Sequence, residues 1–305
     1  MDKIIITTGD PNGIGAEITM KALKALNLPK EKIAIISNKK ILNYYGKLDK
    51  NYEIIEIPYN ENDIKVGQVT KEAGEFSFQS LKLACELKPK AIVTAPVAKN
   101  ALHLAGHNFN GQTEVLQHFL AHDNQLAEML FVANGFRVLL LTRHCALKEI
   151  TLTQDVVVTK IKNLVKTFQK QFSINNPKFA LCGFNPHSGE DGILGREEID
   201  ILIPAVQELQ NAGIDITMPL PADTLFVDAA KNYLKNTKDK YDCYIANYHD
   251  QGLIPIKTVA GENTVNMTIG LDIVRTSPGH GTAFDIAGKN IASPNGMIAA
   301  IKEVL

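Results

Sequence analysis

Residues 244–250, with the sequence YIANYHD, contain the pattern that decides the fold: a short apolar run that ends abruptly in polar residues. The same pattern occurs in four more places, at Ile4–Ile6, Ala91–Val93, Val138–Leu141 and Phe179–Leu181. Continuous apolar runs of this length, rich in Val and Ile, are typical of strands that are buried on both faces of a sheet. The five runs therefore predict five buried strands.

Amphipathic helical patterns lie between these runs. The predicted helices are Gly15–Leu26, Gly74–Leu87, Thr113–Ala121, Asp155–Gln171 and Arg196–Ala212. Alternation of strands and helices favours an α/β fold with a largely parallel sheet. Ligands of such sheets gather beyond the carboxyl ends of the strands, so we expect the polar residues that follow the five runs to line one edge.

The composition argues against several classes of protein. A formal net charge of −1 provides no field that would attract nucleic acid or an anionic membrane. No apolar run approaches the roughly 18 residues that a membrane span requires, and the first one is too short for a signal peptide. The four cysteines form no C-x-x-C pair and are expected to be reduced. We therefore expect a cytoplasmic protein that binds neither nucleic acid nor membranes.

The length of 305 residues is compatible with two domains. The turn-like sequence at 108–111 predicts a domain boundary. The polar segment 45–65 is expected to contain loops and an edge strand. Residues 296–305 are expected to form a closing helix that packs back on the first domain, which would make that domain discontinuous in sequence.

Three of the eight histidines, His144, His187 and His249, stand just beyond the carboxyl ends of predicted strands. Three neutral imidazoles with open coordination positions can form a catalytic site for a divalent metal ion. The pattern leaves open that each is only a loop histidine. Asp250 could orient the ring of His249 or join the coordination sphere. Two further pairs have four-residue spacing but lack the glutamate of H-E-x-x-H, and are interpreted as solvent-facing histidines or histidines satisfied by hydrogen bonds: His103 with His107, and His118 with His122.

Other residues indicate a phosphorylated ligand and a nucleotide. Lys257 and Arg275 are strong donors for phosphate or carboxylate groups. Gly279 and Gly281 flank His280 and allow that loop to wrap closely around a ligand. The segment TTGDPNGIGAE at 7–17 matches neither the Rossmann fingerprint nor a P-loop, so it predicts a tight turn before a helix. Together these features favour an enzyme that acts on a small phosphorylated substrate.

With these motifs the chain resembles the 4-hydroxythreonine-4-phosphate dehydrogenases, which are enzymes of pyridoxal phosphate biosynthesis. The matching motifs are TTGDPNGIGAEI (7–18), GQTE (111–114), NPHSGEDG (185–192), YHDQGL (248–253) and RTSPGHGTAFDIAG (275–288). The resemblance implies the two-domain α/β fold of isocitrate and isopropylmalate dehydrogenases, with a mixed sheet and the active site in the inter-domain cleft. It also implies a homodimer with the active site at the subunit interface.

On this resemblance, the first domain comprises 1–108 with 287–305. The second comprises 109–286 and carries the metal ligands and the dimer contacts. The three histidines named above match the family's metal ligands, with zinc, magnesium or cobalt as the ion. The substrate-binding positions correspond to Gln112, Thr113, Lys257, Asn266 and Arg275. The loop that binds NAD or NADP corresponds to His280, Gly281, Thr282 and Ala283. Asp250 and Lys257 are the candidate catalytic residues.

The chain departs from the family pattern at three positions. Gln112 stands where the family usually has histidine, and an amide cannot exchange a proton near neutral pH. Ala16 replaces the usual proline. Gly279 replaces the usual aspartate beside the nucleotide loop, which leaves the choice between NAD and NADP open.

The reaction implied is the oxidation of 4-phosphohydroxy-L-threonine to 2-amino-3-oxo-4-phosphohydroxybutyrate, which then decarboxylates to 3-amino-2-oxopropyl phosphate. One alternative is the same chemistry on a related phosphorylated acid, threonate or erythronate 4-phosphate, and Gln112 makes this alternative more credible. A metal-dependent hydrolase is a second alternative, because three imidazoles and an open position can also generate hydroxide. A hydrolase would have no use for the HGTA loop.

Overall fold

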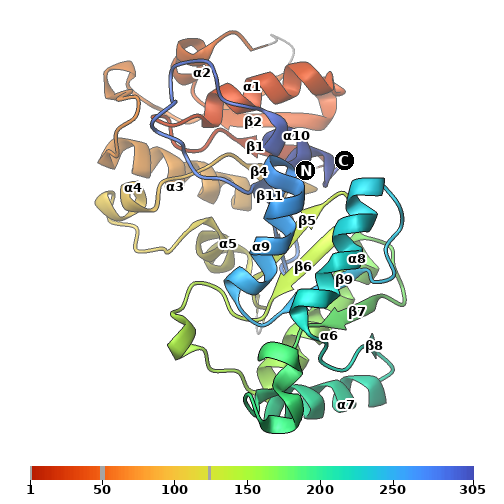
Figure 1. Cartoon of the computed structure of the whole chain (residues 1–305). Helices are drawn as coiled ribbons and strands as arrows, with labels where there is room; N and C mark the ends of the chain where they lie inside the picture. The colour runs from red at the N-terminus through yellow and green to blue at the C-terminus, as the bar shows by residue number, and fades with distance from the viewer. Residues whose placement is uncertain (1, 49–51, 123–124) are drawn as a thin grey trace. The chain divides into compact units, whose positions relative to one another are not determined.

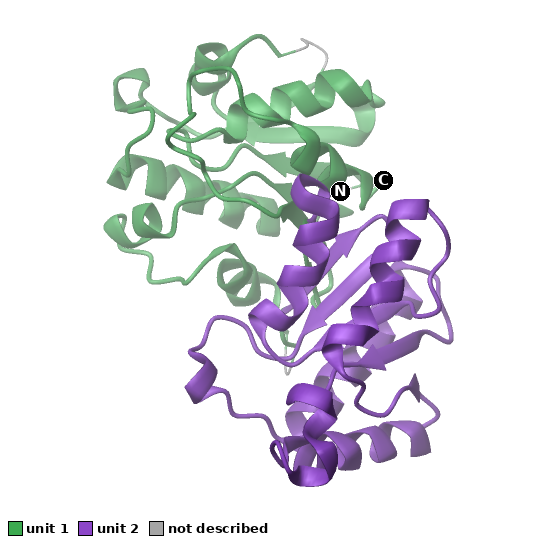
Figure 2. Cartoon of the chain, viewed as in Figure 1, with its two compact units in different colours: residues 1–127, 265–305 green, residues 128–264 purple. Residues whose placement is uncertain are grey.

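The computed structural model describes residues 2–48, 52–122 and 125–305 (Figure 1). The chain divides into two compact units: unit 1 comprises 1–127 and 265–305, and unit 2 comprises 128–264 (Figure 2). This division places 109–127 and 265–286 in unit 1, whereas the sequence analysis groups them with the second domain. The sequence-based domain assignment, with its metal ligands and dimer contacts, stays a prediction.

Unit 1 contains a mixed sheet with the strand order β3-β2-β1-β4-β11-β10. Its strands are β1 (Ile4–Thr7), β2 (Ile33–Ser37), β3 (Glu53–Glu56), β4 (Ala91–Thr94), β10 (Val265–Ile269) and β11 (Val274–Pro278). β1 runs parallel to β2 and β4, and β11 runs parallel to β4, whereas β10 is antiparallel to β11. The sheet is therefore mixed, as the family resemblance implies, and not wholly parallel.

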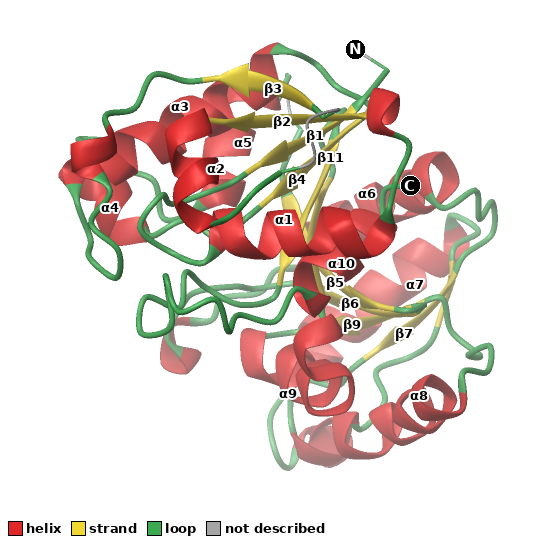
Figure 3. Cartoon of the chain, turned by 90° about the horizontal axis from the view of Figure 1, so that it is seen from above, coloured by secondary structure: helices red, strands yellow, loops and turns green. Residues whose placement is uncertain are grey.

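Helices cover both faces of the unit 1 sheet (Figure 3). They are α1 (Gly15–Leu26), α2 (Lys39–Tyr45), α3 (Lys71–Glu86), α4 (Lys99–Leu104), α5 (Gln112–Leu120) and α10 (Asn295–Lys302). Successive side chains of β1 point to opposite faces, so Ile4 and Ile6 pack in one core cluster and Ile5 in another. The first cluster includes residues of α1 and α10, and the second includes residues of α3 and α5. This two-sided burial explains why β1 is a continuous apolar run.

Unit 2 contains strands in the order β5-β6-β9-β7-β8. They are β5 (Glu128–Ala133), β6 (Phe136–Leu140), β7 (Lys178–Leu181), β8 (Asp215–Ile216) and β9 (Cys243–Ala246). β5 and β6 form an antiparallel hairpin around Asn134 and Gly135, which both have positive φ, as a tight hairpin turn requires. The remaining neighbours, β6–β9, β9–β7 and β7–β8, are parallel.

The unit 2 strands are also covered on both faces. The helices are α6 (Gln154–Gln171), α7 (Ile203–Asn211), α8 (Ala222–Lys235) and α9 (His249–Ala260). Figure 3 shows α8 and α9 over one face and α6 and α7 over the other. A core cluster joins Phe226 of α8 and Ile256 of α9 to Val138 of β6 and Tyr244 of β9. Because β6, β9, β7 and β8 are parallel, their carboxyl ends lie at one edge, where the following loops can meet.

Four of the five predicted helices agree with the structure to within a few residues, and the five predicted strands are all present. The fifth helix begins differently, because Glu198–Leu202 forms a π-helical turn before α7. The predicted edge strand in segment 45–65 is β3, while residues 49–51 of that segment lie outside the described residues. Within the described ranges, no helix has the length and apolarity that a membrane crossing requires.

Candidate active site

In unit 2, the three histidines predicted to bind metal follow three neighbouring parallel strands. His144 lies beyond β6, His187 lies beyond β7, and His249 begins α9 directly after β9. Because β6, β9 and β7 are adjacent and parallel, their carboxyl ends share one edge of the sheet. The strand pattern of the sequence thus accounts for the placement of all three loops.

Asn247 and Gln251 tie these three loops together. The backbone N–H and the hydroxyl of Thr142 donate to the Asn247 carbonyl, at 3.1 and 2.7 Å. Asn247 Nδ2 donates to the Cys182 carbonyl at 2.9 Å. Gln251 Nε2 donates to the Gly183 carbonyl at 2.7 Å, and its Oε1 accepts from the Asn247 N–H at 2.7 Å. Hydrogen bonds to main-chain atoms therefore fix the loops after β6, β7 and β9 relative to one another.

His144 and His249 lie close together, with 5.5 Å between their ring centroids. His249 Nδ1 lies 2.7 Å from Asp250 Oδ1, and His187 Nδ1 lies 2.7 Å from Glu190 Oε1. A carboxylate on one ring nitrogen orients an imidazole and leaves the other nitrogen for a metal ion. The Glu190 hydrogen bond also raises the pKa of His187 above its usual range.

The arrangement of these donors fits a divalent ion only in part. His144 and His249 are neighbours, and the carboxylates on His249 and His187 suit imidazoles that act as ligands. No group of three His, Cys, Asp or Glu side chains that could hold an ion occurs among residues 2–48, 52–122 and 125–305. The structure brings two of the predicted ligands together, and the three-histidine site stays a prediction.

The loop that carries His187 has an unusual backbone. Five consecutive residues, His187 to Asp191, have positive φ values between 42° and 84°. Four of them are not glycine, and an L-residue in this conformation costs roughly 1–2 kcal/mol. Buried Glu198 holds the loop, because its carboxylate accepts from Asn185 N–H at 2.7 Å and from Asn185 Nδ2 at 2.9 Å. Strain of this kind concentrates at functional sites.

In unit 1, Arg275 is buried and forms no ion pair within the described residues, although the Glu114 carboxylate interacts with it from a longer distance. The residue is 2% exposed, and its Nε donates to Thr94 Oγ1 at 2.8 Å while a terminal nitrogen reaches Thr268 Oγ1 at 3.5 Å. Burial lowers the pKa of Arg275 to about 9 and the charge of Glu114 opposes this shift, so the guanidinium still carries its charge at neutral pH. Across the described part of the chain, no Asp or Glu lies within ion-pair distance of it.

The strand register explains how this cation acquires its neighbours. Arg275 of β11 pairs with Thr268 of β10, and Ser277 pairs with Asn266. Cross-strand partners and residues two apart share a face of the sheet, so Asn266 lies on the same face as Arg275. On the other side β11 pairs with β4, whose last residue Thr94 accepts the Arg275 hydrogen bond. The antiparallel β10–β11 pair therefore builds a polar patch inside an otherwise apolar unit.

Two amide oxygens of unit 1 are also buried without a partner in the described residues: Gln112 Oε1 and Asn266 Oδ1. Gln112 begins α5, and its Nε2 donates to the Ala95 carbonyl at 3.2 Å, next to Thr94. Its neighbour Thr113 is 4% exposed. A buried polar atom without a partner costs roughly 1–3 kcal/mol, so these groups suit a ligand that supplies the missing contacts. Four of the five predicted substrate residues thus belong to unit 1.

The remaining candidates lie on α9 and on the loop after β11. Asp250 and Lys257 are seven residues apart on α9, which places them on one face, two turns from each other. His280 and Gly281 are exposed, and the Thr282 carbonyl accepts from Ile14 N–H at 3.1 Å. The HGTA loop therefore contacts the N-terminal glycine-rich turn, a contact that the sequence pattern did not predict.

Sequence reasoning also missed the roles of Thr94, Thr268 and Asn247. Thr94 and Asn247 were recognised only as polar residues at strand ends. Thr268 carries no local signal at all, since its contact with Arg275 follows from an antiparallel register. Only a prediction of the β10–β11 pairing could have found it.

Comparison with known proteins identifies similar chains along the whole length. The sequence model of the family "Pyridoxal phosphate biosynthetic protein PdxA" matches residues 3–304. A 4-hydroxythreonine-4-phosphate dehydrogenase of Sulfurihydrogenibium sp. (strain YO3AOP1) is 37% identical, covering 99% of this chain and 97% of that protein. A D-threonate 4-phosphate dehydrogenase of Salmonella typhimurium is also 37% identical, covering 98% and 97%.

Solved structures give the same result. The crystal structure of a 4-hydroxythreonine-4-phosphate dehydrogenase from Klebsiella pneumoniae superposes with a TM-score of 0.85 at 33% identity, covering 100% of this chain and 98% of that one. The isocitrate dehydrogenase from Methylococcus capsulatus shares the fold, with a TM-score of 0.50 at 14% identity over 99% of this chain and 85% of that one. The predicted fold class is confirmed.

Proposed function

Because the chain belongs to the PdxA family of pyridoxal phosphate biosynthesis, we propose that it is the dehydrogenase of 4-phosphohydroxy-L-threonine. Family membership confirms the resemblance that the motifs predicted. The reaction oxidises the secondary alcohol to 2-amino-3-oxo-4-phosphohydroxybutyrate with NAD or NADP. The product is a β-keto acid, which loses carbon dioxide to give 3-amino-2-oxopropyl phosphate.

The buried guanidinium of Arg275 is the observation that supports this function most directly. A buried cation that has no carboxylate within ion-pair distance, only the more distant Glu114, is stabilised when an anion of a ligand joins it. The Thr94 and Thr268 hydroxyls hold the guanidinium in place for a phosphate or carboxylate of the substrate. The unpartnered oxygens of Gln112 and Asn266 suit the hydroxyl or ammonium group of the same molecule. A phosphorylated amino acid offers both kinds of group.

The metal ion of this proposal is zinc, magnesium or cobalt, held by His144, His187 and His249. A divalent ion bound there would lower the pKa of the substrate hydroxyl and stabilise its alkoxide form. Asp250 keeps the ring of His249 oriented through its contact with Nδ1, and Glu190 does the same for His187. These contacts favour an orienting role for Asp250 over that of proton acceptor.

The dinucleotide would bind at His280 to Ala283 and accept the hydride. Lys257, on the same face of α9 as Asp250, would donate to an anionic group of the substrate. We propose a homodimer with the active site at the subunit interface. In this arrangement, histidines from two copies of the chain could complete the coordination of one ion.

Gln112 favours a second candidate, the oxidation of D-threonate 4-phosphate. The relative from Salmonella typhimurium carries that name at an identity equal to that of the Sulfurihydrogenibium dehydrogenase. The two substrates differ in an amino against a hydroxyl group at one carbon, and Gln112 Oε1 can accept from either. Comparing kcat/KM on the amino acid phosphate and the hydroxy acid phosphate will separate the candidates.

The function is tested by absorbance at the reduced-nicotinamide band with a divalent metal ion present. We expect reduction of NAD or NADP that depends on a phosphorylated substrate and stops when a chelator is added. The control is the unphosphorylated acid, which lacks the anion that Arg275 would hold. No reduction of either dinucleotide, with both phosphorylated acids tried, would refute the dehydrogenase assignment.

A further inference from the structure

The loop at 280–285 depends on its surroundings for its shape. It follows β11, is exposed or half-exposed throughout, and includes the non-glycine Ala283 at a φ of 44°. A backbone hydrogen bond that closes its end runs from Ile286 N–H to the Ala283 carbonyl, at 3.1 Å. A loop with so little internal bonding takes its conformation from the segments against which it packs.

Two glycines form the walls on which this loop rests. A Cβ atom added to Gly13 would lie 2.9 Å from the Thr282 carbonyl oxygen. A Cβ atom on Gly67, which has a φ of 75°, would lie 3.0 Å from the Phe284 carbonyl oxygen. The loop backbone therefore passes close to both glycines, and their position determines where the loop lies.

Asn12 connects the two walls. It is fully buried and directly precedes Gly13, and its carbonyl accepts from Gly67 N–H at 2.9 Å. Its side chain completes the link to the segment 65–70, because Oδ1 accepts from the Lys65 N–H at 2.7 Å. Nδ2 donates to the Gln68 carbonyl at 3.0 Å and to Thr70 Oγ1 at 3.2 Å. The amide thus uses its acceptor and both donors, a combination that a hydroxyl or a carboxylate lacks.

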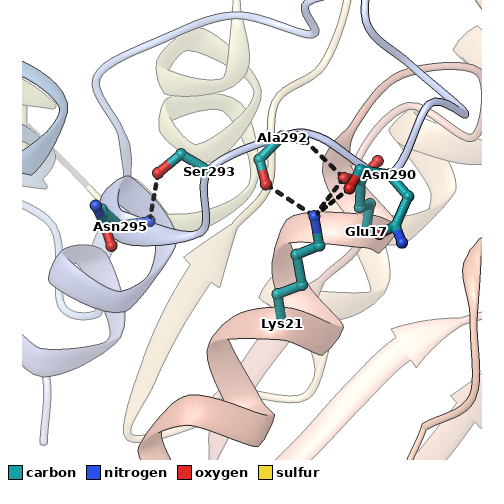
Figure 4. A network of polar contacts seen from close by, with 6 residues as sticks. All are labelled: Glu17, Lys21, Asn290, Ala292, Ser293 and Asn295. Atoms are coloured by element: carbon teal, nitrogen blue, oxygen red, sulfur yellow. Dashed lines mark hydrogen bonds and ion pairs between the residues drawn. The ribbon is translucent and has the colours of Figure 1, made fainter.

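The chain that follows the loop is fixed separately at Asn290 and Ala292, by Lys21 and Glu17 of α1 (Figure 4). Lys21 Nζ donates to Glu17 Oε1 at 2.7 Å and to the carbonyls of Asn290 and Ala292 at 3.0 Å each. Glu17 Oε1 also accepts from the Ala292 N–H at 2.9 Å. The chain after the loop is therefore tied to α1, and the Gly13 and Gly67 walls determine the path before that tie.

We infer that Asn12 is a positioning residue for the dinucleotide, which fixes the Gly13 and Gly67 walls and so shapes the loop at 280–285. The inference rests on the proposed function, because that proposal places the cofactor on residues 280–283. Asn12 belongs to no predicted substrate, metal or cofactor set, and among the described residues its side chain hydrogen-bonds to main-chain atoms and to Thr70. Its effect should therefore appear in dinucleotide binding and not in binding of the phosphorylated substrate.

The first test compares Asn12→Ala with Asn38→Ala. Asn38 is a matched control, since it is buried in the same unit and also joins two segments, accepting from Lys40 N–H and donating to the Ile57 carbonyl. We expect Asn12→Ala to raise the Kd and KM of the dinucleotide about tenfold, the equivalent of one lost hydrogen bond. The KM of the phosphorylated substrate should stay within about twofold, and Asn38→Ala should change neither constant.

A second pair of variants covers the case in which Asn12→Ala fails to fold. Gly67→Ala and Gly213→Ala both place an alanine at positive φ, where a side chain is strained. Nothing lies within 4 Å of a Cβ atom at Gly213, whereas one at Gly67 would press on the Phe284 carbonyl. Only Gly67→Ala should weaken dinucleotide binding. Equal effects of the two glycine variants, or an unchanged dinucleotide Kd in Asn12→Ala, would overturn the inference.

Hydrogen exchange separates failure of this inference from failure of the proposed function. Peptides that cover 279–288 should exchange faster in Asn12→Ala than in the wild-type protein, and at the wild-type rate in Asn38→Ala. If the wild-type protein binds no dinucleotide but the exchange difference appears, the proposed function fails and the positioning of the loop stands. Unchanged exchange in Asn12→Ala refutes the positioning role whatever the cofactor.

Discussion

The polar patch around Arg275 in unit 1 and the histidine loops of unit 2 differ in how their polar groups are buried and paired. In unit 1 the groups are buried, and several lack partners: Arg275 forms no ion pair, and the amide oxygens of Gln112 and Asn266 accept nothing within the described residues. In unit 2 the histidine rings are exposed or half-buried, and two of them contact a carboxylate, with His249 on Asp250 and His187 on Glu190. Both regions contain buried polar atoms without a partner in the described residues, since unit 2 has Arg143 Nη1, Ser188 Oγ and Asn247 Oδ1. They differ in that unit 1 also buries a cation, whereas unit 2 has backbone strain at 187–191.

If unit 2 carries the chemistry, His249→Ala should have the largest effect on activity. Loss of a metal ligand should exceed the roughly 10–100-fold that loss of an outer partner causes, so we expect kcat/KM to fall by 10³-fold or more. Asp250→Asn should stay within that smaller range. Steady-state kinetics and the metal content of the purified protein are the measurements.

The control is His122→Ala, which removes an exposed imidazole of unit 1 that belongs to no predicted site. It should keep full activity and full metal content. A His249→Ala protein that turns over normally and retains its metal would show that the exposed rings of unit 2 are only loop histidines.

Arg275→Met should weaken substrate binding and yet not weaken the fold. Truncating one partner of a buried charge pair costs about 2–5 kcal/mol, so the KM of the phosphorylated substrate should rise by roughly 10²–10³-fold. The free energy of unfolding without substrate should stay the same or rise by about 1–3 kcal/mol, because an unpaired buried cation is replaced by an apolar side chain. Kinetics and urea denaturation measure the two effects.

Lys160→Met provides the matched comparison, because Lys160 pairs with buried Glu128 in unit 2. Removing that cation leaves an uncompensated carboxylate, and we expect a loss of about 3–5 kcal/mol. If Arg275→Met destabilises the fold to the same extent, then Arg275 has a structural role and unit 1 is not built around a missing anion.

The sequence predicted the unit 2 region better than the unit 1 region, for a physical reason. His144, His187 and His249 follow apolar runs that are visible locally, and parallel strands bring their ends to one edge. The hydrogen bonds from Arg275 to Thr94 and Thr268 depend on β10 running antiparallel to β11 and on β11 pairing with β4. No local pattern specifies those pairings. Arg275 was singled out as a donor for anionic groups from its residue type, whereas Gln112, Thr113 and Asn266 came from the family resemblance.

Two other features had no readable signal. The left-handed run at 187–191 contains glycine only at Gly189, so its sequence does not suggest five positive φ values. The packing of residues 112–120 in unit 1 also had no local signal, because it depends on Val115 and Leu116 of α5 entering the core of that unit. Both depend on tertiary contacts, which decide where a segment belongs more strongly than its own composition does.

Unit 1 contains a second buried ionisable residue, Asp10, which makes the stability of the fold depend on pH. It is 1% exposed, its Oδ1 accepts from Asn12 N–H at 2.9 Å, and its Oδ2 has no partner in the described residues. Burial raises the pKa of Asp10 from 3.8 to about 6, so the folded protein prefers the protonated form. The stability that this preference provides is present below pH 4 and is lost as the pH rises through 6, by about 3 kcal/mol in total.

Asp10→Asn should therefore be more stable than the wild-type protein at pH 7, by up to about 3 kcal/mol, and should lose this advantage below pH 4. The amide keeps an oxygen for the Asn12 N–H and carries no charge to desolvate. Urea denaturation of both proteins at several pH values between 4 and 7 measures the difference. Parallel stability profiles would show that the carboxylate of Asp10 finds a partner on folding.

Substitution of Gln112 tests whether unit 1 only binds the substrate or also takes part in proton transfer. Its expected effect on kcat/KM is the smallest of those predicted here. Gln112→Ala removes an acceptor for the substrate amino or hydroxyl group, so kcat/KM should fall about tenfold, as for one lost hydrogen bond. The shape of its pH profile should not change, because an amide does not titrate.

The control is Gln79→Ala. Gln79 lies on α3 and its side chain donates to Glu75, so this variant should keep wild-type kinetics. A pH profile that differs between Gln112→Ala and the wild-type protein would mean that unit 1 takes part in proton transfer. The division between a binding region and a chemical region would then have to be abandoned.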